Sequence, residues 1–102
     1  MSMTGHLEIN KFRDTLEKGL IIENDKLVKI ILAIGSAGNE KITDEEIQEL
    51  TELSMDSVVK SIDLLDSSNF ITAIIQDIPN RSLHKVCQLT PKGEDVFKLI
   101  IG

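Results

Sequence analysis

The side chains best suited to metal binding or nucleophilic catalysis are His6, His84 and Cys87. His84 and Cys87 are three residues apart on a predicted strand, where successive side chains point to opposite faces, so they cannot share a ligand. No Cys or His pair has zinc-site spacing, and the chain lacks a glycine-rich phosphate loop and a supported Ser/His/Asp arrangement. We therefore expect no catalytic residue, no metal and no cofactor, and the sequence argues against an enzyme.

Cys87 is the only cysteine in the chain, so no intrachain disulfide can form. A chain without disulfides suits a reducing cytoplasm. Because half of a strand's side chains face inward, we expect Cys87 to act as a small hydrophobic residue of the core. The alternative is a redox-sensing thiol, for which Lys85 supplies the one flanking positive charge.

The net charge of −6 is concentrated in one segment. Residues 43–67 contain eight acidic residues and one basic residue, a net charge of −7, whereas residues 1–42 sum to 0 and residues 68–102 to +1. Part of this acidity has a structural role, because Thr43 and Glu46 have the spacing of a capping box. Carboxylates are also favourable at the positive end of a helix dipole.

Apolar spacing predicts an amphipathic helix over residues 6–20, with Ile9, Phe12, Leu16 and Leu20 on one stripe. This stripe packs either on its own domain or against a second copy through the final helix. For such a dimer the candidate residues are Ile9, Phe12, Leu16, Leu20, Phe97 and Ile100.

The remaining elements follow from caps, turns and periodicity. A helix capped at Asn24 or Asp25 ends near Gly35, and a short edge segment follows at 41–43. Two further helices begin at Thr43 and Ser54. Strands at 70–77 and 83–89 flank a turn at 78–82, and Thr90 caps a final helix. In the helix after Thr43, we expect Ile47, Leu50 and Leu53 to face the core.

The 102 residues suit one domain, which we divide into a tail and amphipathic helix at 1–24 and a main unit at 25–102. The predicted fold class is α+β, mainly α, with a two- to three-stranded sheet between helices. The longest apolar run, Ile30–Ile34, is far shorter than the roughly 20 residues that cross a bilayer. The N-terminus has no signal-peptide pattern, and we expect a cytoplasmic protein without membrane contact.

Two motifs resemble those of a known family. The first is leucine-serine, a buried valine, a leucine, and then a leucine and an acid followed two residues later by glycine-leucine-isoleucine. Here these places hold Leu53-Ser54, Val58, Ile62, Leu65-Asp66 and Asn69-Phe70-Ile71. The second is leucine-threonine-x-x-glycine, present at residues 89–93. With both motifs in order, residues 25–98 resemble the winged helix-turn-helix domains of archaeal and bacterial transcription regulators, including the multiple-antibiotic-resistance-regulator (MarR) type.

The resemblance implies a homodimer that binds double-stranded DNA. Helix 54–67 would enter the major groove. The wing, residues 78–85, would lie on the DNA backbone. The implied DNA contacts are Ser57, Lys60, Ser61, Asn80, Arg81 and Lys85. Phosphate neutralisation supplies most non-specific affinity, so the lysines and the arginine matter most.

The acidity of residues 43–67 departs from the family pattern, since Lys60 is the only basic residue there and Asp56 would repel phosphate. An alternative function follows from this departure, because winged helices also serve as protein-contact modules. The acidic surface would then bind a basic protein partner within a transcription or replication assembly, with Met55, Val59 and Leu64 as apolar contacts.

Overall fold

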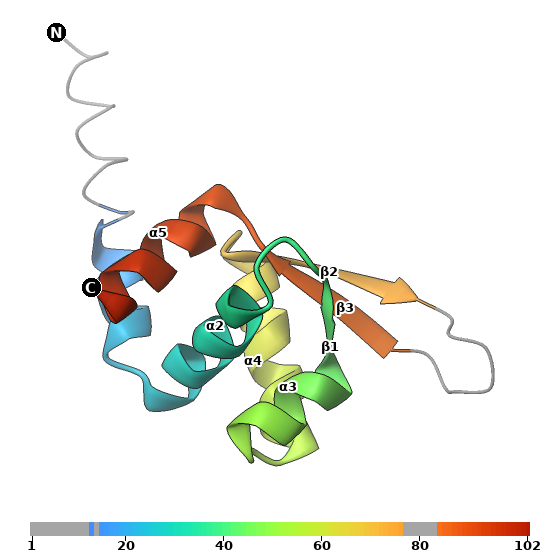
Figure 1. Cartoon of the computed structure of the whole chain (residues 1–102). Coiled ribbons are helices and arrows are strands. Elements are labelled where there is room, and N and C mark those ends of the chain that lie inside the picture. Colours follow the sequence, from blue (N-terminus) through green and yellow to red (C-terminus); the bar gives the residue numbers. More distant parts are fainter. Residues whose placement is uncertain (1–12, 14, 77–83) are drawn as a thin grey trace, which may run out of the picture.

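The computed structural model describes residues 13, 15–76 and 84–102. Residues 15–22 are helical and overlap the predicted N-terminal helix, whose earlier residues lie outside the described part of the chain. The elements that follow are α2 (Asp25–Ser36), β1 (Ile42–Thr43), α3 (Asp44–Thr51), α4 (Met55–Ser67), β2 (Ile71–Gln76), β3 (His84–Leu89) and α5 (Pro91–Ile101). Figure 1 shows the small sheet extending to one side of the helices. The predicted mainly helical α+β class is confirmed.

Each helix begins where a side chain satisfies free backbone N–H groups. The Asn24 side chain accepts from the N–H groups of Lys26 and Leu27 at the start of α2. Thr43 and Glu46 form the predicted capping box of α3. Ser54 caps α4, and Thr90 caps α5 with Pro91 in the first turn.

The turn between α3 and α4 depends on Glu52, whose φ of 60° places it in the left-handed region. Its N–H donates to the carbonyl oxygen of Gln48 at 2.8 Å. The hydroxyl of Thr51 donates to the Ile47 carbonyl at 2.7 Å and accepts from the Leu53 N–H at 3.4 Å. These bonds end α3 and let Ser54 start α4 at once, which produces the helix-turn-helix.

The three strands form an antiparallel sheet in the order β1-β3-β2. The short β1 pairs with β3, with Ile42 opposite Cys87, as predicted for the segment at 41–43. β2 pairs with β3 along its full length, from Ile71 opposite Leu89 to Gln76 opposite His84. The sheet therefore has β2 on one edge and a two-residue strand on the other.

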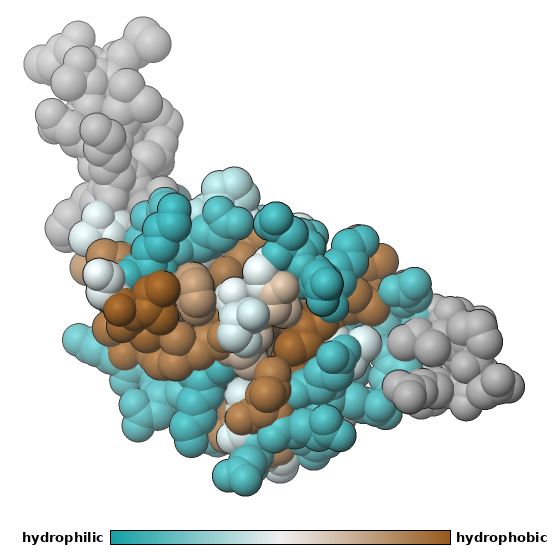
Figure 2. Space-filling view, viewed as in Figure 1, coloured by the Kyte–Doolittle hydropathy of each residue, from teal (hydrophilic) through white to brown (hydrophobic). Residues whose placement is uncertain are grey.

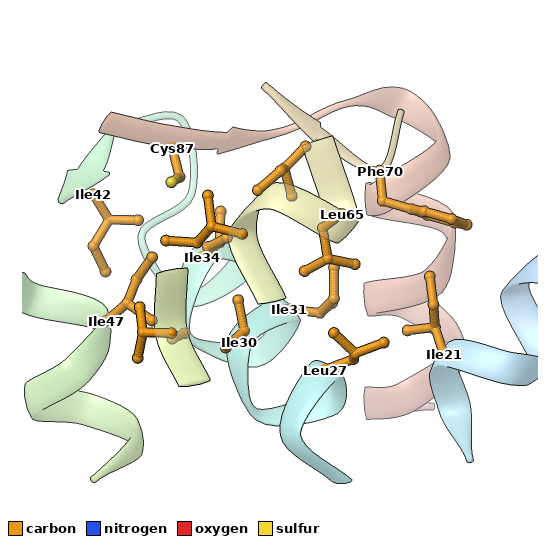
Figure 3. Close-up of a cluster of buried hydrophobic side chains, with 14 of the residues drawn as sticks. Ile21, Leu27, Ile30, Ile31, Ile34, Ile42, Ile47, Leu65, Phe70 and Cys87 are labelled. Carbon is orange, nitrogen blue, oxygen red and sulfur yellow. The ribbon is translucent and has the colours of Figure 1, made fainter. Parts of the chain in front are cut away.

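The core lies where α2 meets the other helices and the inner face of the sheet (Figure 3). Side chains from every described element of this region contribute, and the fully buried ones include Ile30, Ile31, Ile34, Ile47, Val58, Ile62, Leu65, Phe70, Ile71, Cys87 and Val96. Burying a large apolar side chain stabilises a fold by about 1.5–3 kcal/mol, so this cluster is the main source of stability.

The expectation that Leu50 faces the core is wrong, because its side chain is 62% exposed. The buried face of α3 is formed by Ile47 and Thr51, which are four residues apart and lie on one side of the helix. Leu50 is turned away from that line and borders a groove between α2 and α3 with Leu32 and Ala33.

The connection between α4 and β2 meets the start of α5 at Gly93. The carbonyl oxygen of Phe70 accepts from the Thr90 N–H at 3.1 Å, and the Thr90 hydroxyl donates to the Asn69 carbonyl at 2.6 Å. A Cβ atom on Gly93 would lie 1.9 Å from the same Phe70 oxygen. The glycine of the second motif is therefore required by a close approach of two backbones.

We expect Gly93→Ala to lower the free energy of unfolding by about 1–3 kcal/mol, because the added methyl group forces α5 away from Phe70. Urea denaturation measures the change. Gly19→Ala is the matched control: the added Cβ meets nothing within 4 Å in a helical segment, and it should raise stability by about 0.5–1 kcal/mol. Equal stability of the two variants would contradict this account of Gly93.

Candidate nucleic-acid interface

Helix α4 is oriented by its apolar stripe of Val58, Ile62 and Leu65, all of them buried. The stripe faces the core, so the opposite side of the helix faces outward. That outer side carries exposed Asp56, Lys60, Asp63 and Leu64. The outward surface of the second helix of the helix-turn-helix is thus mixed in charge.

Ser61, one of the implied DNA contacts, is not exposed on this surface. Ser61 is 8% exposed, because it lies three residues after Val58 and four before Leu65, within the buried stripe. Ser57 is half-buried near the start of the helix. Of the three predicted positions on α4, Lys60 is the fully accessible one.

Lys60 and Ser57 each have a charged neighbour. The ammonium group of Lys60 lies 3.1 Å from a carboxylate oxygen of Asp56, one turn earlier, and both side chains are exposed. The Nζ atom of Lys26 lies 3.5 Å from the Ser57 hydroxyl oxygen. Lys26, in the first turn of α2, therefore brings a second positive charge to the start of α4.

Lys85, the last residue of the predicted wing, connects β3 to the helix-turn-helix. Lys85, on β3, forms an ion pair with Asp63 of α4, and its side chain is 28% exposed. The pair neutralises one of the acidic residues on the outer side of α4 and fixes α4 relative to the sheet. The other predicted wing contacts, Asn80 and Arg81, lie outside the described residues.

His84 forms a second connection between β3 and the helix-turn-helix. The side chain is 5% exposed, and its Nδ1 atom lies 3.2 Å from a carboxylate oxygen of Asp44 at the start of α3. Its Nε2 atom lies 3.6 Å from Glu45 and makes no hydrogen bond among the described residues. Within the same residues, no group of three or more His, Cys, Asp or Glu side chains has an arrangement that could hold a metal ion.

The predicted dimer residues fall into two groups. Leu16 and Leu20 are 52% and 67% exposed, whereas Phe97 and Ile100 are half-buried and pack against the core. Ile9 and Phe12 lie outside the described residues.

Leu99 and Ile101 were not among the candidates, although both are 61% exposed. Figure 2 shows a broad hydrophobic area around the end of α5 and the neighbouring α2. Ion pairs between Lys18 and Asp95 and between Lys92 and Glu17 hold helix 15–22 beside α5.

Cys87 is fully buried in the core, as expected for a small hydrophobic residue. Burial is the main reason that its pKa is raised to about 12, and the negative charge of Asp44 adds to the effect. A thiol with this pKa is protonated at physiological pH and is a poor nucleophile. The redox-sensing alternative therefore has no support from the environment of Cys87.

Known proteins resemble this chain in structure. No family model and no curated protein matches its sequence. NadR in complex with 4-hydroxyphenylacetate aligns with a TM-score of 0.64 at 14% identity, covering 98% of this chain and 71% of NadR. A mutant MarR from E. coli complexed with operator DNA gives 0.62 at 18% identity, covering 96% and 69%. Bacillus subtilis PadR in complex with operator DNA gives 0.61 at 16% identity, covering 74% and 46%.

The element order, the tight α3–α4 turn and the β2–β3 hairpin strands define a winged helix-turn-helix protein. The fold is the one found in the MarR, SlyA, NadR and PadR proteins, and the resemblance seen in the two sequence motifs is confirmed. The described residues contain no helix with the length and hydropathy required to cross a membrane.

We expect Cys87 to react with a thiol reagent such as DTNB at pH 8 far more slowly than a free thiol. A pKa of about 12 in place of 9.0 reduces the thiolate fraction about a thousandfold, and burial blocks access as well. Stopped-flow or manual absorbance measurements would show the rate. Full reaction in urea provides the control, and fast reaction of the folded protein would contradict the buried thiol.

Proposed function

We propose that this protein is a DNA-binding transcription regulator of the winged-helix type. Support comes from its fold, which it shares with MarR and PadR proteins solved in complex with operator DNA. In this proposal α4 with its cap, residues 54–67, enters the major groove, and the wing at 78–85 lies on the flanking backbone. A DNA target and a chain without disulfides fit a cytoplasmic site of action.

The contacts assigned to α4 are Lys60 and Ser57, joined by Lys26 from α2. Lys60 is accessible at the middle of the outer side, and Lys26 lies beside the first turn of α4. Ser61 is left out of the proposal because its side chain is buried. On the wing, Arg81 and Asn80 would contact the DNA backbone, and Lys85 would add a positive charge at the start of β3.

Several carboxylates of the acidic unit have partners within the protein. Asp63 is paired with Lys85, Asp56 with Lys60, and Glu46 with the backbone at the start of α3. A carboxylate paired with a cation repels phosphate less than a free one, and salt screens exposed charges over about 8 Å. The cost is that Lys60 and Lys85 must exchange a carboxylate for a phosphate when DNA binds.

The proposed biological unit is a homodimer formed by helix 15–22 and α5. The exposed apolar residues Leu16, Leu20, Leu99 and Ile101 lie on these two helices, which are joined by two ion pairs. Covering this surface with a second copy would remove it from water, and in the proposed dimer the two α4 helices lie on one side of a duplex. Half-sites about 34 Å apart would then match the two-fold symmetry.

We expect Lys60→Ala and Arg81→Ala each to weaken binding to all duplex sequences, because each removes one phosphate contact. The salt slope should fall by about 1 for Arg81→Ala and by less for Lys60→Ala, because Asp56 already offsets part of the charge of Lys60. Fluorescence anisotropy between about 50 and 200 mM salt measures both quantities. Lys98→Ala, in the last turn of α5, is the charge-matched control and should bind as the wild type does. Wild-type protein that binds no duplex at about 50 mM salt would exclude the regulator and favour the protein-contact module.

We expect Asp63→Asn to raise the affinity for duplex DNA and to steepen its salt dependence, by up to about 0.9 in slope, because Lys85 is released from its carboxylate partner. Glu40→Gln is the matched control. It removes the same charge at an exposed position in the loop before β1, outside α4 and outside the proposed dimer helices. If both variants gain affinity equally, net charge alone is responsible and Lys85 has no specific role.

A further inference from the structure

Strand β2 forms one edge of the sheet, with β3 on its inner side. Its register with β3 is continuous over six residue pairs from Ile71 to Gln76. Helix α4 contacts β2 on one face and buries Ile71. Further along the strand, Ile74 and Ile75 point to opposite faces and are 56% and 64% exposed.

Proteins normally protect an edge strand from pairing with another chain by shortening it or by adding lysine, proline or a bulge. β2 uses none of these devices. It is six residues long, its sequence ITAIIQ has no charge and no proline, and its pairing with β3 runs without interruption. The whole segment 67–76 is also uncharged. Among the described residues no strand other than β3 pairs with β2, so its outer edge is competent to accept another strand.

We infer that β2 pairs with β2 of a second copy as antiparallel strands, joining the two sheets into one. An isologous contact of this kind uses the same surface on both chains. Two copies, each with a net charge of −6, repel one another, and an uncharged strand is where their backbones can meet with no like charges opposite. The pairing would also cover Ile74 and Ile75, which the rest of the described chain leaves exposed.

The second-copy contact at β2 is separate from the proposed dimer of helix 15–22 and α5. The strand and the helices lie on different parts of the molecule (Figure 1). Salt should also act on strand pairing in the opposite sense to DNA binding. It screens the repulsion between two anionic chains and favours association, whereas it weakens contacts to phosphate.

Amide hydrogen exchange of the wild-type chain, at low and high micromolar concentration, tests the pairing directly. Alternate amides of an antiparallel strand point to opposite sides, so every second amide of β2 faces away from β3. We expect these amides to exchange more slowly at high concentration, while those that face β3 are protected at both. Exchange that does not change with concentration along β2 would overturn the inference without requiring any variant.

Sedimentation velocity of three variants locates the contact. Ile74→Lys and Ile75→Lys should weaken the association about tenfold or more, because lysines of both copies meet at the shared edge. Leu50→Lys, at a 62% exposed site on α3, is the matched control and should leave the association unchanged. Circular dichroism confirms that each variant is folded.

A fourth variant, Leu20→Lys, distinguishes this contact from the helical dimer. Association that Leu20→Lys abolishes, but Ile74→Lys and Ile75→Lys leave intact, would overturn β2 pairing and would still support the dimer of the proposed function. Loss of association in the two β2 variants alone, together with the alternating exchange pattern, would establish the strand contact whether or not the protein binds DNA.

Discussion

Helix α2 is the element on which the rest of the fold depends. Ile30, Ile31 and Ile34 are almost completely buried, and α2 contacts α3, α4, α5 and β3. The free energy of removing these side chains from water therefore holds both helices of the helix-turn-helix, one strand and the final helix in a single arrangement. Because Val58 and Ile62 of α4 are buried in this core, the residues on the opposite side of the helix face outward.

This constraint assigns the acidic residues to two different roles. Those near helix starts, such as Glu46, complete caps and act within α3. Asp63 is turned toward β3 and pairs with Lys85, so it links α4 to the sheet while it neutralises a cation. The sequence total of −7 over residues 43–67 thus overstates the charge that a ligand at the outer side of α4 would meet. The distribution of pairs, and not the sum, determines the local field.

Features with local causes could be predicted from the sequence, and features with distant causes could not. Caps at Thr43, Ser54 and Thr90 depend on side chains within three residues, and all were predicted. The ion pair of Lys85 with Asp63 joins residues 22 apart, and Lys26 reaches Ser57 across 31, so neither contact leaves a local pattern. Ser61 and Leu50 were placed wrongly because the width of a helix's buried face is set by the neighbours that cover it.

In the proposed function, the ion pairs of Lys60 and Lys85 place particular demands on DNA recognition. Non-specific affinity comes almost entirely from phosphate neutralisation, and here each cation of α4 and β3 must first leave a carboxylate. In the proposed function the background attraction of these two lysines to any duplex is reduced, and base contacts and DNA shape supply a larger share of the binding free energy. Specificity is the ratio of specific to non-specific affinity. The acidic surface lowers the non-specific affinity, which is the denominator of this ratio. Acidity that weakens binding to bulk DNA is for this reason compatible with a selective regulator.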